Sequence, residues 1–286
     1  MRIIVLTAIA MLAFAANSVL ARLALAGSAI DAASYTGIRL IAGAALLYPL
    51  LTWGPGTGRS RKMGGSWPGA AALFGYAIFF SIAYLMLGAG LGALILFTSV
   101  QMSMLGWAVF KGDRPGLIEW VGIGVALASL TYLVSPGLTA PHPFGAVLMA
   151  LAGASWAVYS VIGRGSKSPL ADTTGNFARC VPIAIALTGF GLLTTSVAWE
   201  GVAYAVASGA IASGLGYAVW YLALPSLSRV NASTVQLTVP AIAAAGGVLF
   251  IGEAITLRLA IASIGILGGV AIALWAAEHR KRAMNP

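Results

Sequence analysis

Long hydrophobic segments alternate with short polar connections along the whole chain. Ten such segments can be drawn, and none keeps the two-residue alternation of a membrane β-strand. Each holds about 18 to 25 residues, enough for a helix to cross a hydrocarbon core of about 30 Å. The pattern predicts an all-α polytopic membrane protein with ten transmembrane helices near residues 3–25, 32–52, 68–88, 91–110, 116–134, 143–163, 173–197, 201–223, 230–251 and 256–277.

Composition supports this prediction and narrows the chemistry. The chain is 60% hydrophobic and only 8% charged, whereas soluble domains carry about 25% charged residues. The single cysteine, Cys180, excludes an intramolecular disulfide and a cysteine metal cluster. Both histidines, His142 and His279, lie outside the predicted spans, which argues against a histidine metal site within the membrane. We therefore expect no metal and no cofactor.

Positive charges gather on alternate connections between the spans. With the N-terminus inside, the cytoplasmic side holds Arg59, Arg61, Lys62, Lys111, Arg114, Arg164, Lys167, Arg229, Arg280, Lys281 and Arg282. The other side holds little beyond Arg22 and Arg258. Cytoplasmic loops of membrane proteins carry such an excess of Lys and Arg, so both termini are predicted to be cytoplasmic. The net charge of +9 is thus a topology signal, and nucleic acid is not an expected partner.

An internal repeat divides the chain into two halves. The stretch from Phe14 to Arg22 reappears as Trp156 to Arg164, and the turn at Gly112 reappears at Gly252. The halves cover residues 1–138 and 139–286, with five predicted spans each. An odd number of spans turns the second copy over in the bilayer, giving two inverted five-helix repeats. This architecture is typical of carriers, whose substrate site lies between the repeats near the membrane midplane. Because the repeat needs the first span, we expect it to be retained rather than cleaved as a signal peptide.

Ionisable residues within the spans are few. Arg39 and Arg179 occupy matching places in the second and seventh spans. Each can tie the halves together or snorkel to an interface, or can face a central cavity and bind a carboxylate. Asp31 and Asp172 precede these two spans and are expected to cap their helices. Glu253, at a helix end, is expected to form a boundary pair with nearby Arg258.

The middle of every predicted span lacks Asp, Glu and His. Proton-coupled carriers commonly use buried acidic or histidine relays. Their absence favours a substrate that moves down its own gradient, although Na⁺ coupling through backbone carbonyls stays open.

Uncharged polar and aromatic side chains supply the remaining candidates. Amides are costly to leave unpaired in lipid, and rings with a polar edge suit amphipathic solutes or an ammonium group. An interfacial belt or plain packing is the alternative for each ring. With the two arginines, the predicted substrate-binding residues are Asn17, Tyr76, Tyr84, Gln101, Trp156, Tyr159, Tyr217, Trp220, Gln236, Arg39 and Arg179.

Glycine clusters in the last span of each half are expected to let helices approach closely. They include Gly122 and Gly124, and Gly265, Gly268 and Gly269. Packing inside the bundle is the favoured interpretation, and a homodimer seam is the alternative.

No enzyme motif is present. The chain lacks the phosphate-binding Gly-x-x-x-x-Gly-Lys-Ser/Thr loop and the Gly-x-Ser-x-Gly nucleophile turn. We therefore predict that the protein is not an enzyme.

Two sequence features carry a resemblance to a known family. The stretch from Val239-Pro240-Ala241 to Gly252-Glu253 is similar to a proline followed by a small-residue helix and an apolar-Gly-Glu turn in EamA-type carriers. The first half keeps the turn as Gly112-Asp113 but has Val100 in place of the proline. The whole chain, with its predicted inverted halves, resembles this family of the drug/metabolite transporter superfamily, and most of all its YddG-type amino-acid exporters. The resemblance implies a bacterial inner-membrane protein whose cavity is lined mainly by spans 1, 3, 4, 6, 8 and 9.

These observations predict an exporter or facilitator of aromatic and other neutral amino acids and similar small metabolites. It would work by alternating access in the bilayer, without ion coupling. A proton-coupled multidrug or other metabolite carrier of the same fold is the first alternative. A membrane-embedded enzyme or scaffold is the alternative from another class.

Overall fold

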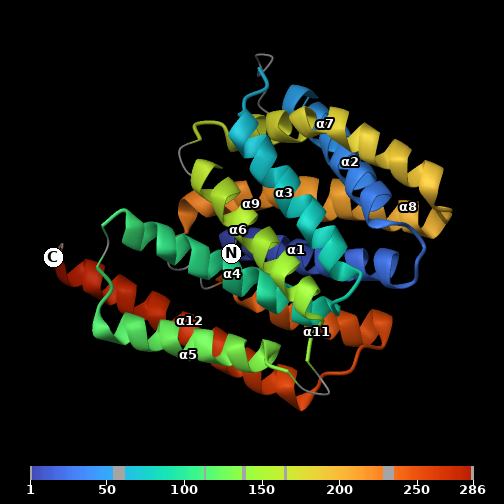
Figure 1. Cartoon of the computed structure of the whole chain (residues 1–286). Coiled ribbons are helices and arrows are strands. Elements are labelled where there is room, and N and C mark those ends of the chain that lie inside the picture. The colour runs from blue at the N-terminus through green and yellow to red at the C-terminus, as the bar shows by residue number, and fades with distance from the viewer. Residues whose placement is uncertain are drawn as a thin grey trace.

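The computed structural model describes residues 2–53, 62–112, 114–136, 140–163, 166–227 and 235–284 (Figure 1). All regular elements within these ranges are helices. They are α1 Arg2–Ala26, α2 Ala32–Trp53, α3 Trp67–Tyr84, α4 Ala89–Phe110, α5 Leu117–Val134, α6 Pro143–Gly163, α7 Pro169–Thr194, α8 Trp199–Val206, η1 Ala207–Leu215, α9 Gly216–Ala223, η2 Leu224–Ser226, α11 Thr238–Ile251 and α12 Leu257–Met284.

Nine of the ten predicted spans correspond to helices of membrane length among the described residues. Among the described residues, nine spans are long and apolar enough to cross a membrane, with α8, η1 and α9 forming one continuous span from Trp199 to Ala223. The shorter apolar helix α11 provides the described part of the predicted span 230–251, whose first residues lie outside the described ranges. The prediction of an all-α polytopic membrane protein is confirmed.

Several helix boundaries differ from the predicted ones: α3 ends at Tyr84 rather than at 88, and α12 extends to Met284 rather than to 277. Helix α7 begins at Pro169, four residues before the predicted start at 173, because proline fits the first turn of a helix and Ser168 precedes it. Asp172 therefore lies inside α7, and the expectation that it caps the start of this helix is wrong. Its carboxylate instead accepts hydrogen bonds from the Gly65 N–H and the Ser166 hydroxyl. Asp31 caps α2 as expected, since its Oδ1 accepts from the N–H groups of Ala33 and Ser34, each at 2.9 Å.

The eighth span contains a π-helix that the sequence pattern does not predict. Residues Ala207–Leu215 form η1 between α8 and α9. A Cβ added at Gly209 would lie 2.1 Å from the Arg39 carbonyl oxygen, so only glycine lets η1 approach the α2 backbone this closely. π-helical turns inside longer helices are frequent at functional sites.

Helices from the two halves pack against their counterparts. α2 lies along α7, α4 contacts α11, and α5 lies along α12; the first and last of these pairs are visible as neighbouring ribbons in Figure 1. The contact of α3 with α6 is likewise matched by that of α9 with α1. Exchanging the halves therefore reproduces the main packing pattern.

Glycines bring α5 and α12 into backbone contact. A Cβ on Gly122 would lie 2.6 Å from the Gly269 carbonyl oxygen, and a Cβ on Gly269 would lie 2.6 Å from the Gly122 carbonyl oxygen. Gly124 and Gly268, by contrast, face open space. The first two glycines thus serve packing inside the bundle, as the sequence favoured.

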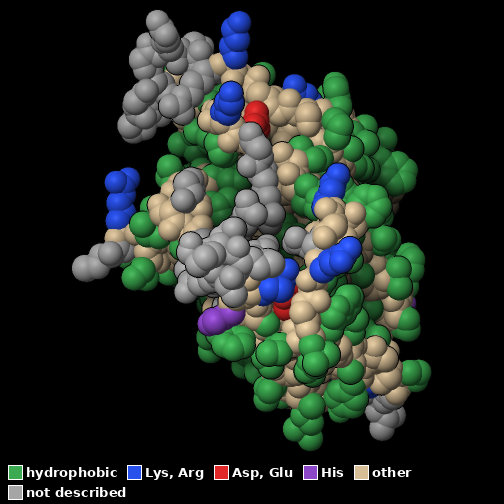
Figure 2. Space-filling view, turned by 90° about the vertical axis from the view of Figure 1, so that its left-hand side faces the viewer, with side chains coloured by type: hydrophobic (Ala, Val, Ile, Leu, Met, Phe, Trp, Pro, Cys, Tyr) green, Lys and Arg blue, Asp and Glu red, His purple; other side chains and the backbone are tan. Residues whose placement is uncertain are grey.

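The two ends of the bundle differ in charge. We call the end with Lys62, Lys111 and Lys167 the basic end; it also holds the start of α1 and the C-terminal part of α12 (Figure 1). The end with Arg22, Glu253 and Arg258 is the opposite end. Figure 2 shows Lys and Arg side chains gathered on the face toward the viewer, with hydrophobic side chains around them. The predicted orientation places the basic end in the cytoplasm.

Candidate substrate site

Four aromatic rings from four helices meet in the interior. Phe14 of α1, Tyr76 of α3, Trp156 of α6 and Tyr217 of α9 form what we call the aromatic cluster. The Trp156 ring centroid lies 5.0 Å from that of Tyr76, 4.9 Å from that of Tyr217 and 6.4 Å from that of Phe14. Such spacings are those of attractive offset and edge-to-face ring pairs. The cluster brings two helices of each half to one point.

A small cavity lies among these rings. Its volume is about 20 Å³, which holds about one water molecule. A substrate therefore fits only if some of these side chains move. The lining comprises Phe14, Asn17, Ser18, Tyr76, Phe80, Leu96, Phe97, Trp156, Ala212 and Tyr217.

A hydrogen-bonded polar network adjoins the cavity. The Ser208 hydroxyl donates to Asn17 Oδ1 at 2.6 Å, and Asn17 Nδ2 donates to the Tyr76 hydroxyl at 3.0 Å. Arg39 Nη2 donates to the same Tyr76 hydroxyl at 3.1 Å and to the Ser213 hydroxyl at 3.2 Å. These five residues, which we call the polar network, link α1, α2 and α3 of the first half to η1 of the second.

Of the remaining predicted rings, two lie between this centre and the ends of the bundle, and one lies beside it. Tyr84 is buried near the opposite end, where its hydroxyl donates to the Ala89 carbonyl at 3.3 Å. Tyr159 is buried towards the basic end, with its hydroxyl 3.5 Å from that of Thr173. Trp220 contacts Phe14 at a ring-centroid distance of 5.9 Å, beside the aromatic cluster. Together the rings form a column through the bundle.

Of the two predicted glutamines, one lies on α4 and the other lies just before α11. Gln101 is buried on α4, and Gln236 is half-buried just before α11. Neither lines the small cavity. Both stay candidates on the helices that the resemblance assigns to the cavity wall.

The two repeat-matched arginines have different environments. Arg179 Nη1 donates to the carbonyls of Gly64 and Gly175 at 2.7 and 2.8 Å, and its guanidinium lies 6.0 Å from the Trp67 ring centroid. It thus ties α7 to the segment before α3, near the basic end. Arg39 belongs to the polar network, so the structure brings only Arg39 to the centre.

An ion pair joins α1 to a residue just after α11 at the opposite end. Arg22 Nε lies 3.1 Å from Glu253 Oε1, and Arg22 Nη1 donates to the Tyr84 carbonyl at 3.1 Å. Glu253 Oε2 accepts from the Ala89 N–H at 2.8 Å. The expected pairing of Glu253 with Arg258 is wrong, because Arg258 instead donates to the carbonyls of Tyr132 and Ser135.

Glycines form the seat of the Glu253 carboxylate. A Cβ on Gly88 would lie 2.9 Å from Glu253 Oε2, and one on Gly247 would lie 2.7 Å from the same oxygen. The carboxylate therefore fits between α4 and α11 only where both residues lack side chains. Gly252, in the left-handed region with φ of 75°, ends α11 and turns the chain to Glu253. We call Arg22, Glu253 and these backbone contacts the ion-pair closure.

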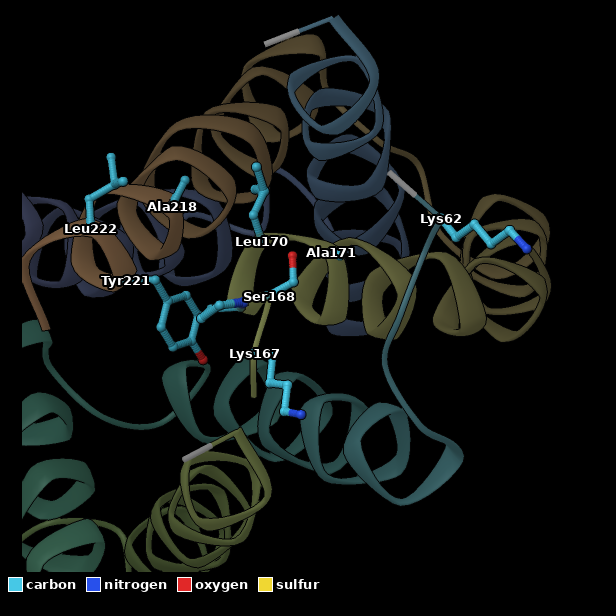
Figure 3. A pocket seen from close by; sticks show the side chains of 9 residues that line it. Lys62, Lys167, Ser168, Leu170, Ala171, Ala218, Tyr221 and Leu222 are labelled. Carbon is cyan, nitrogen blue, oxygen red and sulfur yellow. The ribbon is translucent and has the colours of Figure 1, made fainter. Parts of the chain in front are cut away.

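A wide cavity opens at the basic end. Its volume is about 590 Å³. Figure 3 shows Tyr221 of α9 facing the segment of Lys167 and Ser168, with Lys62 further along. The lining comprises Lys62, Lys167, Ser168, Pro169, Leu170, Ala171, Ala218, Tyr221 and Leu222. Its two ammonium groups give it a positive rim.

Three members of the site were missed from the sequence. The sequence pattern singles out Phe14 only as part of the repeat, and it does not single out Ser208 and Ser213 of η1. Ser208 and Ser213 are five positions apart, so on an α-helix they would point about 140° apart. The i→i+5 geometry of a π-helix brings them to one face. Hydroxyls in an otherwise small, apolar run were the one available signal.

Helices long enough to span a membrane around a central aromatic and polar site are the architecture of a membrane transporter. A family model described as the EamA-like transporter family matches residues 143–275. An uncharacterised protein of Pseudomonas aeruginosa, PA1977, is 46% identical over 275 residues, covering 96% of this chain and 94% of the relative. The chain belongs to the EamA-like transporter family.

More distant relatives include proteins with named substrates. The threonine/homoserine exporter RhtA of Salmonella typhimurium is 31% identical over 52% of this chain and 51% of its own length. RhtA of Escherichia coli K12 is 29% identical over 60% of this chain and 64% of its own length. A crystal structure 22% identical in sequence covers 95% of this chain and 97% of its own, with a TM-score of 0.63, which supports the fold. The finer likeness to YddG-type exporters stays a prediction.

Proposed function

We propose that this protein exports neutral amino acids and similar small amphipathic metabolites across the bacterial inner membrane. The observation that carries the proposal is the aromatic cluster beside the polar network. Rings suit the apolar part of a solute, whereas amide and hydroxyl groups fix its polar part. The names of the RhtA relatives, which are threonine/homoserine exporters, support the substrate class.

We propose alternating access between two inverted five-helix halves as the mechanism. The ion-pair closure seals the opposite end, while the basic end holds a cavity of about 590 Å³. If the basic end faces the cytoplasm, the conformation is ready to receive a solute from inside. Rocking of one half against the other would then break the ion-pair closure and open the far side. The matched packing of α2 with α7 and of α5 with α12 supports two related halves.

Transport without ion coupling is part of the same proposal. Among the described side chains, the acidic ones lie near helix ends: Asp31, Glu119, Asp172, Glu200 and Glu253. Glu119 and Glu253 form ion pairs with Arg280 and Arg22, and Asp31 and Asp172 accept backbone hydrogen bonds. A proton relay through the centre would need an acidic or histidine side chain there. This placement disfavours the proton-coupled multidrug alternative.

The test is solute uptake by purified protein in liposomes. We expect labelled threonine and other neutral amino acids to move down their own gradients with no imposed ion gradient. Transport that requires a proton or sodium gradient would overturn the uncoupled mechanism. Failure to move any amino acid in a broad panel would overturn the substrate class.

Trp156→Ala tests the site itself. This change removes the ring that contacts Phe14, Tyr76 and Tyr217, and we expect uptake to fall by roughly tenfold or more. The control is Trp275→Ala on α12, whose exposed ring lies outside the cluster. Equal uptake by the folded Trp156→Ala protein and the wild type would show that the cluster is not the substrate site.

A further inference from the structure

Arg39 is a buried cation with no acidic partner in the described part of the chain. The exposed fraction of Arg39 is only 2%. The ion pairs found among the described residues join Arg22 to Glu253 and Arg280 to Glu119, and neither includes Arg39. Arg39 lies seven residues into α2, about 10 Å from its start at the helical rise of 1.5 Å per residue. It therefore sits well inside the spanning region.

Neutral groups stabilise this guanidinium only in part. Its Nε and Nη2 donate to the Ser213 hydroxyl at 3.3 and 3.2 Å. The charge also lies 5.1 Å from the ring centroid of Tyr76 and 4.8 Å from that of Phe80, both of which line the small cavity. The third nitrogen, Nη1, is buried and has no hydrogen-bond partner. An unpaired cation inside a membrane protein is costly and is retained mainly at substrate or ion sites.

We propose that Arg39 binds the carboxylate of the transported molecule and that, in the empty carrier, the Ser213 hydroxyl occupies the place of this carboxylate. The inference rests on the proposed export function and names the group that this function would recognise. A carboxylate accepts two parallel hydrogen bonds from one guanidinium, a geometry stronger than bonds to neutral hydroxyls. It would pair with Nη1 and Nη2 once the Ser213 hydroxyl withdraws.

The surroundings of Arg39 restrict the rest of the molecule. The aromatic cluster can hold an ammonium group by cation–π attraction, and Asn17 Oδ1 already accepts a hydrogen bond from Ser208 at this point. With no described acidic side chain in the network, a second positive charge on the solute would be repelled by Arg39. Small zwitterions and monocarboxylates therefore fit, whereas amines without a carboxylate do not.

Carboxylate binding would also act on the contact between the halves. Arg39 lies on α2, whereas Ser213 lies on η1, whose Gly209 contacts the Arg39 backbone. Replacing the serine hydroxyl by a ligand releases η1 from the Arg39 side chain. The same event that binds the solute thus loosens a bond between the two moving parts.

The experiment compares threonine with two analogues that lack its negative charge, threoninamide and 1-aminopropan-2-ol. Uptake into liposomes and thermal protection in detergent are measured for the wild type, which needs no variant to fold. We expect threonine to be favoured at least roughly tenfold over both analogues, the gain of a charge-assisted hydrogen-bonded pair. Equal preference for acid and amide in both measurements would overturn the proposal.

Variants then test which residues cause the preference for threonine over its amide. Arg39→Gln should lower threonine affinity roughly 10- to 100-fold and leave threoninamide unchanged, while Arg39→Lys should retain part of the preference. Ser213→Ala should tighten threonine binding about two- to fivefold, because no hydroxyl competes for the guanidinium. A purely structural Ser213 would instead weaken binding on removal. Arg258→Gln, which removes a charge near the opposite end, should not change the preference.

Failure of the two proposals can be told apart. If the wild type moves none of the three compounds, amino-acid export is wrong, and protection by propionate against propionamide still tests the carboxylate site. Stronger protection by propionate that disappears in folded Arg39→Gln would support the site. If threonine is transported but Arg39→Gln keeps the wild-type preference, export stands and the role of Arg39 is wrong.

Discussion

The two ends of the bundle differ in how their charges are used. At the opposite end, Arg22 and Glu253 neutralise each other and join residues 231 positions apart in the chain. At the basic end, Lys62 and Lys167 line an open cavity of about 590 Å³. A paired arginine and glutamate hold helices together, whereas lysines on a cavity rim can attract an anionic solute. The comparison teaches that the opposite end has a specific charge contact, while the basic end has positive charge around a cavity.

The largest effect is expected from Gly88→Val at the ion-pair closure. A Cβ there would lie 2.9 Å from Glu253 Oε2 and would displace the carboxylate from its seat. We expect transport to fall roughly tenfold or more, because a carrier that cannot close one side loses alternation. The measurement is uptake into liposomes.

Gly106→Val is the matched control for that change. It places the same side chain on α4, where a Cβ meets no atom within 4 Å. Equal loss of transport in both variants would show that the closure is not the cause.

A smaller effect is expected from Arg22→Gln. The change leaves Glu253 without its cation, and because both side chains are about one-fifth exposed, the stability loss should be about 1–2 kcal/mol. Transport should fall roughly three- to tenfold. A second measurement is the labelling of a cysteine at position 17 (Asn17→Cys in a Cys180→Ala background) by a thiol reagent added on the side of the opposite end. Labelling should be faster with Arg22→Gln than with Arg22 present.

The charge-swapped protein, Arg22→Glu with Glu253→Arg, sharpens this prediction. Partial recovery of transport is expected if the pair itself closes the end. A swapped protein that folds but transports no better than the single variants would mean that the Ala89 and Tyr84 backbone contacts matter more.

A modest effect is expected at the basic end. Lys167→Gln together with Lys62→Gln should raise the apparent KM for an anionic solute about two- to threefold, because the cavity loses its positive field. Added salt should reduce the wild-type advantage, since exposed charges are screened beyond about 10 Å at 0.1 M. An advantage that persists at high salt would argue for direct binding by the lysines.

The smallest effect on transport is expected from Glu119→Gln. Glu119 is buried and pairs with Arg280 at 2.6 Å, which joins α5 to α12 away from the aromatic cluster. Thermal stability should fall, since the buried ion pair between Glu119 and Arg280 is removed, while transport by the folded protein should remain near that of the wild type. A large loss of transport without a loss of stability would give α5 and α12 a direct part in the cycle.

The spans and the depth of Arg39 could be predicted from the sequence, because hydrophobic length and charge placement respond directly to the bilayer. The difference between Arg39 and Arg179 could not, since both occupy matching places in their segments. Arg179 is held by carbonyls that the chain brings near it only on folding. The same applies to Glu253, whose sequence neighbour Arg258 was the wrong partner and whose actual partner lies in the first helix.

The π-helix could not be predicted from the sequence pattern. Small residues from Ala207 to Leu215 give no periodic signal that separates π from α geometry. An α-helix would place Ser208 and Ser213 on different faces of the span, whereas both reach the polar network in the structure. The composition of this segment indicates a helix. Its π-helical geometry occurs where Gly209 makes a close contact with the α2 backbone.

The register of η1 has a consequence for changes in chain length. Removing one residue between Ala207 and Leu215 would rotate everything after it by about 100°, the turn per residue of an α-helix. Tyr217 and Trp220, which now face the interior, would turn toward lipid, and their present positions would pass to Ala218 and Tyr221, so the Tyr217 ring of the aromatic cluster would be lost. A substitution in this segment changes the contacts of one residue. A one-residue deletion would turn every later residue of the span to a different face of the helix. Related sequences that keep this site should therefore vary in residue type here far more readily than in length.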